Sequence, residues 1–236
     1  MLLIVLHFVL GTLAEACDGG AAVGCVDRGC ETVGTVEVCT TCTAGKVPIN
    51  GICKAHDDGE TTAAAGAGCE KKEGGVVDGT STTCGKCTSA NYFLFRNGCY
   101  DATKGVGKTV CTAANNGICT APASGYFVVP SPDAVATEQS VFSCSDTTGV
   151  TLTGNKKYVG VANCATCSAP TEDERVAKCK TCNDKFSLED NQCVSSSTNR
   201  SGLTTGAIAG IAVAVVIVVG GLVGFLCWWF ICRGKA

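Results

Sequence analysis

Apolar residues gather at the two ends of this chain of 236 residues, and the long middle is mostly polar. The second apolar run, Leu203–Cys232, contains no charged residue and consists mostly of Ala, Val, Ile, Leu and Gly. Because about 20 such residues cross the hydrocarbon layer of a bilayer, we expect one transmembrane helix over residues 203–231. Arg233 and Lys235 follow directly, and basic residues beside a span favour the cytoplasmic side. Residues 232–236 would then form a short cytoplasmic tail.

The apolar run at the N-terminus is too short to cross a membrane. Leu2–Val9 forms an apolar core, and Ala14-Glu15-Ala16 has the small-x-small pattern of a cleavage site just before Cys17. We therefore expect residues 1–16 to be a signal peptide, with an uncleaved anchor as the alternative. Together the two runs predict a single-pass type I protein of the plasma membrane whose residues 17–202 are extracellular.

The predicted outer region contains few large apolar side chains and many Gly, Ala, Thr and Ser residues. Such a chain cannot bury enough apolar surface to offset its conformational entropy. It does contain 18 of the 20 cysteines, an even number, and the secretory pathway is oxidising. We therefore predict small disulfide-rich modules, mostly irregular or β-hairpin, in an extended array followed by one transmembrane α-helix. Each bridge would contribute about 2–4 kcal/mol.

A short repeat underlies the cysteine pattern. Three times a CxxC motif is followed, after ten or eleven residues, by a lone cysteine: Cys39, Cys42 and Cys53; Cys84, Cys87 and Cys99; Cys179, Cys182 and Cys193. Tyr92–Phe95 is a β-prone segment inside one unit, and Asn50-Gly51 or Asn97-Gly98 then supplies residues that tolerate a positive φ. The unit is predicted to be a small hairpin whose last cysteine bridges back toward the CxxC.

All 18 cysteines of the outer region are disulfide candidates. Eight form CxxC motifs: Cys39, Cys42, Cys84, Cys87, Cys164, Cys167, Cys179 and Cys182. The other ten are Cys17, Cys25, Cys30, Cys53, Cys69, Cys99, Cys111, Cys119, Cys144 and Cys193. Cys179 is placed so that it could close the unit opened by Cys164 and Cys167 while opening the next. The sequence leaves the connectivity open, because six cysteines alone allow 15 pairings.

Two other interpretations of the CxxC motifs remain. Paired motifs can supply four thiolates to zinc, which makes Cys164, Cys167, Cys179 and Cys182 a candidate zinc site, although oxidation in the secretory pathway opposes it. A redox-active pair of the thioredoxin type requires a βαβ pattern, and the Gly- and Thr-rich surroundings lack one. We expect structural disulfides, with no metal or other cofactor.

Charge and histidine content argue against two classes of function. Without Glu15, Arg233 and Lys235 the chain carries 20 acidic and 16 basic residues, a net charge of −4. No basic stripe is visible, so nucleic-acid binding is not expected. His56 is the only histidine after the predicted signal peptide, which leaves little from which to build a catalytic triad. We expect no catalytic residues and no enzyme activity.

The predicted signal peptide, the repeated CxxC units, the single span and the ending Cys232-Arg233-Gly234-Lys235-Ala236 together resemble the variant-specific surface proteins of Giardia. The terminal pentapeptide is the most specific element. Asn97-Gly98-Cys99-Tyr100 is similar to the Gly-Gly-Cys-Tyr sequence of that family, with Asn in the first place. The resemblance implies a dense surface coat and antigenic variation, with the lipid bilayer, neighbouring coat proteins and host antibodies as partners. It also implies palmitoylation at Cys232 and modification of Arg233.

Resistance to proteolysis is a further expectation, because proteases need locally unfolded chain and a crosslinked array offers little of it. The main alternative function is an adhesion or ligand-binding receptor, since the CxxC units bear a looser similarity to furin repeats. A zinc-binding surface module is the second alternative.

Overall fold

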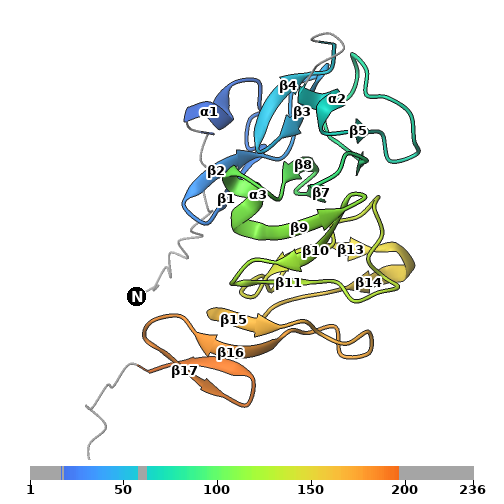
Figure 1. The fold of residues 1–236 in the computed structure, drawn as a ribbon. Helices are drawn as coiled ribbons and strands as arrows, with labels where there is room; N and C mark the ends of the chain where they lie inside the picture. The colour runs from blue at the N-terminus through green and yellow to red at the C-terminus, as the bar shows by residue number, and fades with distance from the viewer. Residues whose placement is uncertain (1–16, 18, 58–62, 197–236) are drawn as a thin grey trace, which may run out of the picture. The chain divides into compact units, whose positions relative to one another are not determined.

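The computed structural model describes residues 17, 19–57 and 63–196, and most of these lie in short β-hairpins and the turns between them (Figure 1). All the described residues up to Ser195 belong to one compact unit. The predicted signal peptide (residues 1–16), span (residues 203–231) and tail (residues 232–236) lie outside the described residues. Within the described ranges, no helix has the length and apolar character needed to cross a membrane.

Nine pairs of strands that are consecutive in the sequence form antiparallel ladders among the described residues. In chain order they are β1 (Cys30–Val33) with β2 (Val36–Cys39), β3 (Lys46–Ile49) with β4 (Ile52–Ala55), β5 (Cys69–Glu70) with β6 (Lys86–Cys87), β7 (Tyr92–Phe95) with β8 (Gly98–Asp101), β9 (Cys111–Asn115) with β10 (Ile118–Pro122), β11 (Tyr126–Val128) with β12 (Val141–Ser143), β13 (Thr151–Leu152) with β14 (Lys156–Lys157), β15 (Cys164–Ser168) with β16 (Lys178–Cys182), and β17 (Phe186–Glu189) with β18 (Gln192–Ser195).

Helices play a minor part in this portion of the chain. The described ones are α1 (Gly19–Ala22), α2 (Ala63–Gly66), α3 (Gly105–Val110) and the 3₁₀ turn η1 (Thr153–Asn155). The prediction of a disulfide-rich chain built mostly from small hairpins is confirmed for the residues that the structure describes.

Two-residue turns with left-handed backbone connect several hairpins. Asn50 and Gly51 have φ values of 52° and 80°, and Asn116 and Gly117 have values of 49° and 81°. These conformations fit the type I′ turns that match the twist of paired strands, and Asn and Gly are the residues that adopt them at least cost. Asn50-Gly51 therefore acts as the sequence predicted, and Asn116-Gly117 forms the same kind of turn.

The turn between β7 and β8 lies one residue earlier than the sequence predicted. Arg96 and Asn97 occupy it, with φ values of 45° and 58°, and Gly98 begins strand β8. A Cβ at Gly98 would lie 2.8 Å from both the Cβ and the carbonyl oxygen of Pro48 on β3. Gly98 is thus needed for close approach between strands rather than for the turn.

That close approach joins two hairpins. Strand β3 pairs in parallel with β8 at Ile49 and Cys99, which gives a four-stranded sheet of order β4-β3-β8-β7. The backbone N–H of Asn50 also donates to the carbonyl oxygen of Cys99 (2.9 Å). Units that are separate in the sequence are therefore connected by backbone hydrogen bonds.

Strand β7 is buried on both faces and separates two hydrophobic clusters. Phe93 and Phe95 point into the first cluster with Tyr100, while Leu94 points into the second with Val47. This division follows from the alternation of side chains along a strand. A third cluster contains Phe127 and Phe142, and a fourth contains Cys144, Val161, Cys164 and Cys179. Apolar packing is thus divided among small clusters, and it contributes more to the stability of the fold than the composition had suggested.

Truncation of Leu94 tests the importance of this packing. Leu94 is 6% exposed, so Leu94→Ala should lower the free energy of unfolding by about 2–5 kcal/mol. Leu188→Ala is the matched control, because Leu188 is also in a strand but is 43% exposed, and its cost should stay below about 1 kcal/mol. Urea unfolding of the oxidised chain measures both. Equal losses would show that the disulfides alone define the fold.

Candidate functional site

The disulfide framework is the main chemical feature of the described chain. All 18 cysteines from Cys17 to Cys193 are bridged, with Cα–Cα distances between 5.3 and 5.9 Å. The pairs are Cys17–Cys30, Cys25–Cys39, Cys42–Cys53, Cys69–Cys84, Cys87–Cys99, Cys111–Cys119, Cys144–Cys167, Cys164–Cys179 and Cys182–Cys193.

Six of these bridges form three copies of a four-cysteine unit. In each copy the first cysteine of a CxxC bonds backward to an upstream cysteine and the second bonds forward to the cysteine of a hairpin. The backward bridges span 14, 15 and 15 residues, and the forward bridges span 11, 12 and 11 residues. We call these the first unit (Cys25, Cys39, Cys42, Cys53), the second unit (Cys69, Cys84, Cys87, Cys99) and the third unit (Cys164, Cys179, Cys182, Cys193). The sequence repeat contained the last three cysteines of each unit but not the upstream cysteine. That cysteine has no motif around it in the first two units, and in the third unit it is Cys164, the first cysteine of another CxxC.

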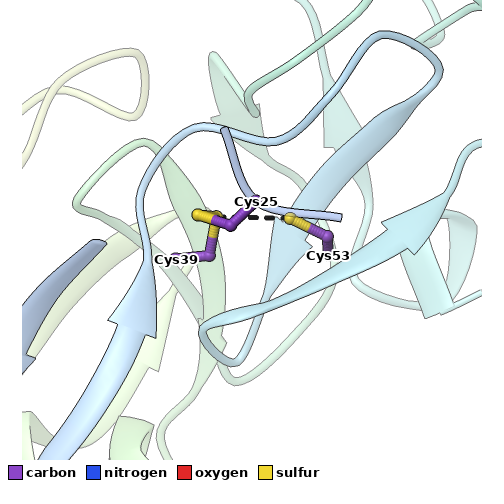
Figure 2. A group of neighbouring side chains, drawn as sticks. All are labelled: Cys25, Cys39 and Cys53. Carbon is purple, nitrogen blue, oxygen red and sulfur yellow. Dashed lines mark hydrogen bonds between the residues drawn. A yellow bond between two sulfur atoms is a disulfide. The ribbon is translucent and has the colours of Figure 1, made fainter. Parts of the chain in front are cut away.

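The two bridges of a unit pack against each other. Figure 2 shows the Cys53 sulfur beside the Cys25–Cys39 bridge, 3.3 Å from the Cys39 sulfur. In the third unit the sulfurs of Cys179 and Cys193 are 3.6 Å apart. The sulfurs of Cys69, Cys84 and Cys99 in the second unit lie within 4.8 Å of one another. Each unit therefore has a compact sulfur cluster where another small domain would have apolar side chains.

A hydrogen bond from the N–H of its first cysteine ties the CxxC of each unit to the hairpin turn that follows it. The N–H of Cys39 donates to the carbonyl oxygen of Gly51 (2.8 Å), and the N–H of Cys84 donates to that of Asn97 (2.8 Å). In the third unit the N–H of Cys179 donates to the side-chain oxygen of Asn191 instead (2.6 Å). The turn before the last cysteine thus positions that cysteine for its bridge.

The fourth CxxC, at Cys164 and Cys167, bonds in the opposite sense. Cys164 bonds forward to Cys179, and Cys167 bonds backward to Cys144 across 23 residues. The two loops therefore overlap, unlike the loops within a regular unit. Cys179 closes a bridge to Cys164 while its CxxC partner Cys182 bonds forward to Cys193, which is the double role that its position in the sequence suggested.

Three sulfur groups of the described chain are compact enough to surround a metal ion: Cys25, Cys39 and Cys53; Cys69, Cys84 and Cys99; Cys179, Cys182 and Cys193. Every member is in a disulfide, whereas zinc binds thiolates. The zinc candidates from the sequence, Cys164, Cys167, Cys179 and Cys182, are divided among three bridges. A zinc site at those residues would need all three bridges to be reduced.

Three carboxylates stabilise local turns through a motif that the sequence analysis missed. Asp78, Asp101 and Asp146 each accept hydrogen bonds from the backbone N–H and the hydroxyl of the threonine two residues later. Burial alone raises the pKa of Asp101, yet the hydrogen bonds from Thr103 and Lys104 hold that pKa below its ordinary value. The signal in the sequence is Asp-x-Thr, which favours a local turn.

A further buried carboxylate connects the loop after β11 to strand β14. The side chain of Asp133 is 7% exposed, contacts the Lys156 ammonium and accepts a hydrogen bond from the Tyr158 hydroxyl (2.6 Å). The hydrogen bond from Lys156, followed by that from Tyr158, lowers the pKa of Asp133. Burial, together with the bond to Asp133, raises the pKa of Tyr158 to about 12.

Comparison with known proteins decides the family. The sequence model for the Giardia variant-specific surface protein matches residues 5–157 and 151–236, which together cover almost the entire chain. The chain belongs to this family. Variant-specific surface protein VSP4A1 of Giardia intestinalis is 40% identical over 239 aligned residues, covering 84% of this chain and 32% of that protein. The major surface-labeled trophozoite antigen 417 of the same organism is 32% identical over 278 aligned residues, covering 96% of this chain and 36% of that antigen.

This member of the variant-specific surface protein family spans about a third of the length of those two relatives. None of the solved structures matches it. The resemblance drawn from the CxxC units and the terminal pentapeptide is thereby confirmed.

Disulfide mapping tests the four-cysteine unit. Peptic digestion of the unreduced chain at acid pH, followed by mass spectrometry, should yield peptides linked through Cys42–Cys53, Cys87–Cys99 and Cys182–Cys193. No bridge should join the two cysteines of one CxxC, because the structure directs them to different partners. A Cys39–Cys42 bridge in the native chain would contradict the unit.

The pH dependence of stability tests the buried carboxylate. Because the pKa of Asp133 is below the value of about 3.9 expected in the unfolded chain, its stabilising contribution is complete above about pH 4 and is lost as the pH falls further. Asp133→Asn should therefore be less stable than the parent chain at pH 6 and should lose less stability between pH 4 and pH 2. The exposed Asp173→Asn is the control. Parallel stability curves for Asp133→Asn and the parent would contradict this role.

Proposed function

We propose that this chain is a surface-coat antigen whose disulfide-bridged outer region resists proteolysis and takes part in antigenic variation. Membership of the variant-specific surface protein family supports a place at the cell surface. In this proposal residues 17–202 face outward, residues 203–231 anchor the protein in the plasma membrane and Cys232 is palmitoylated. Arg233 would be modified in the cytoplasm. Its partners are the lipid bilayer, neighbouring coat proteins and host antibodies.

The distribution of the disulfides is the observation that carries the proposal. Consecutive bridges close loops along the chain, and the loops in the third unit and its neighbour overlap. A protease needs locally unfolded chain, and loops of 8 to 23 residues whose ends are bonded together unfold locally less readily than an open chain. Resistance therefore follows from the bridges and does not require a large core.

The same framework allows the surface to vary. A cysteine unit depends on its two bridges and on a hydrogen bond to the turn, whereas side chains on strands such as β17 are largely exposed. Surface substitutions away from buried or conformationally special positions usually change stability by less than about 0.5 kcal/mol. Sequences with different epitopes can thus share one disulfide framework.

Limited trypsin digestion of the full chain in detergent tests protease resistance. Most of the oxidised chain should stay intact over a period in which the reduced and alkylated chain is fully degraded. The reason is that segments with Lys or Arg inside closed loops cannot adopt the extended conformation that the trypsin active site requires. Reduced and alkylated chain added to the oxidised sample is the control for trypsin activity. Equal digestion rates for the two forms would overturn the proposed role of the bridges.

A further inference from the structure

The strands of each four-cysteine unit bring together two cysteines that are not bonded to each other. In each unit the upstream cysteine lies directly opposite the second cysteine of the CxxC across an antiparallel pair. The opposed pairs are Cys25 with Cys42, Cys69 with Cys87, and Cys164 with Cys182. Directly opposed residues have side chains on the same face and Cα atoms about 4.5–5.5 Å apart, a distance at which disulfides form. A bridge across each opposed pair is therefore within reach.

The two cysteines that such a bridge would leave over are also close together. They are the first cysteine of the CxxC and the cysteine of the hairpin. Their sulfurs are 3.3 Å apart in the first unit, where Figure 2 shows Cys39 and Cys53, and 3.6 Å apart in the third unit, between Cys179 and Cys193. In the second unit the corresponding sulfurs lie within 4.8 Å of each other. Each unit is thus arranged for a second pairing of its four cysteines as well as for the present one.

Access for an attacking thiol separates the third unit from the second. Cys182 and Cys193, which form the forward bridge of the third unit, are both half-buried. Cys193 also lines a cavity of about 360 Å³ together with Gly160, Val161 and Asn191, and a cavity of this size has room for a small molecule. All four cysteines of the second unit are buried. Because thiol–disulfide exchange depends on access to the attacked sulfur, the third unit should react first.

We propose that the third unit is a thiol-reactive site at which a small thiol switches the disulfide pairing. The thiolate of the small molecule attacks the sulfur of Cys193 and forms a mixed disulfide there, and Cys182 leaves as a thiolate. Cys182 then attacks Cys164, which lies opposite it on β15, and Cys179 leaves as a thiolate. Cys179 in turn attacks Cys193, whose sulfur is 3.6 Å away in the present structure, and expels the small thiolate.

These three exchanges balance without a net oxidation or reduction. Cys164–Cys179 and Cys182–Cys193 are broken, Cys164–Cys182 and Cys179–Cys193 are formed, and in each exchange the electron pair of the broken S–S bond leaves with the departing thiolate. The small thiol is regenerated, so it acts as a catalyst. Each new loop is three residues longer than the loop it replaces, because the cysteines of a CxxC are three positions apart. Loop entropy therefore favours neither pairing strongly.

The switch changes how the last hairpin is held. In the present pairing the hairpin of β17 and β18 is bonded to Cys182 at the end of β16, whereas in the alternative pairing it is bonded to Cys179 near the start of that strand. The two loops of the unit, which are now separate, would then overlap. The chain keeps nine bridges in either pairing, so the inference is independent of the proposed protease resistance.

The test treats the full oxidised chain in detergent with 2-mercaptoethanol, in an amount well below the number of chains. Samples are quenched in acid, digested with pepsin and analysed by mass spectrometry, with fragmentation between Cys179 and Cys182 to assign the partner of each. Cys164–Cys182 and Cys179–Cys193 should appear together in at least about a tenth of the chains. More chains should switch than thiol was added, because the thiol is regenerated. The rate should fall about tenfold for each pH unit below the pKa of the added thiol, since the thiolate is the attacking species.

The second unit is the control within the same molecule, and two double variants test the steps. Exchange in the second unit should be at least about tenfold slower, because a thiol reaches its buried bridges only when the unit opens. Cys182→Ser combined with Cys193→Ser removes the entry bridge, and the buried Cys164–Cys179 bridge should then stay closed under the same treatment. Cys164→Ser combined with Cys182→Ser leaves Cys179 and Cys193, which should bond to each other because their sulfurs are already close.

Three results would overturn the inference. The third unit keeps its present pairing throughout the treatment, which would mean that the thiol does not reach it. The Cys182–Cys193 bridge opens and the chain gains the mass of the thiol without forming Cys164–Cys182, which would make it a reducible bridge and not a switch. The second unit exchanges as fast as the third, which would mean that access to Cys193 does not control the reaction.

Discussion

Because nine disulfides close loops of 8 to 23 residues, the unfolded chain has far fewer conformations available than an open chain of the same length. In the loop-entropy model a 15-residue loop contributes about 3 kcal/mol. This constraint explains how strands of two to five residues persist without a large sheet or a single core. The bridges also contribute to the packing, since nine of the 18 bonded cysteines belong to the hydrophobic clusters.

The hairpin of β7 and β8 connects the covalent and non-covalent parts of the fold. Its strand β7 contributes to two clusters, its strand β8 pairs with β3, and its Cys99 closes the second unit. The turn of this hairpin also carries Arg96, whose backbone N–H donates to Gln139 and whose side chain lies between Glu31 and Asp146. One hairpin therefore links residues from three parts of the sequence.

The sequence predicted the local structure well and the long-range structure poorly. Tyr92–Phe95 is a strand as its β-prone residues indicated, and the Asn-Gly pairs at residues 50–51 and 116–117 form turns, because these features depend on neighbouring residues alone. The partners of Cys25 and Cys144 were not predictable, since a bridge depends on the three-dimensional proximity of two Cβ atoms. The pairing of β3 with β8 and the meeting of Arg96 with Asp146 are equally non-local. Gly98 illustrates the contrast between local and long-range effects, because it is required by the close approach of Pro48 on β3 and not by the turn beside it.

The separation of framework from surface has a consequence for how members with this architecture can differ. Arg96 and Asp146 form an ion pair (Nη2 to Oδ2, 3.5 Å), yet neither belongs to a bridge or to the hydrogen bond that ties a CxxC to its turn. Replacing both would remove one contact between the β7–β8 turn and the segment after β12, while every cysteine of the nine bridges stays in place. Because the bridges set the path of the chain, side-chain contacts of this kind can differ between chains that share the cysteine units.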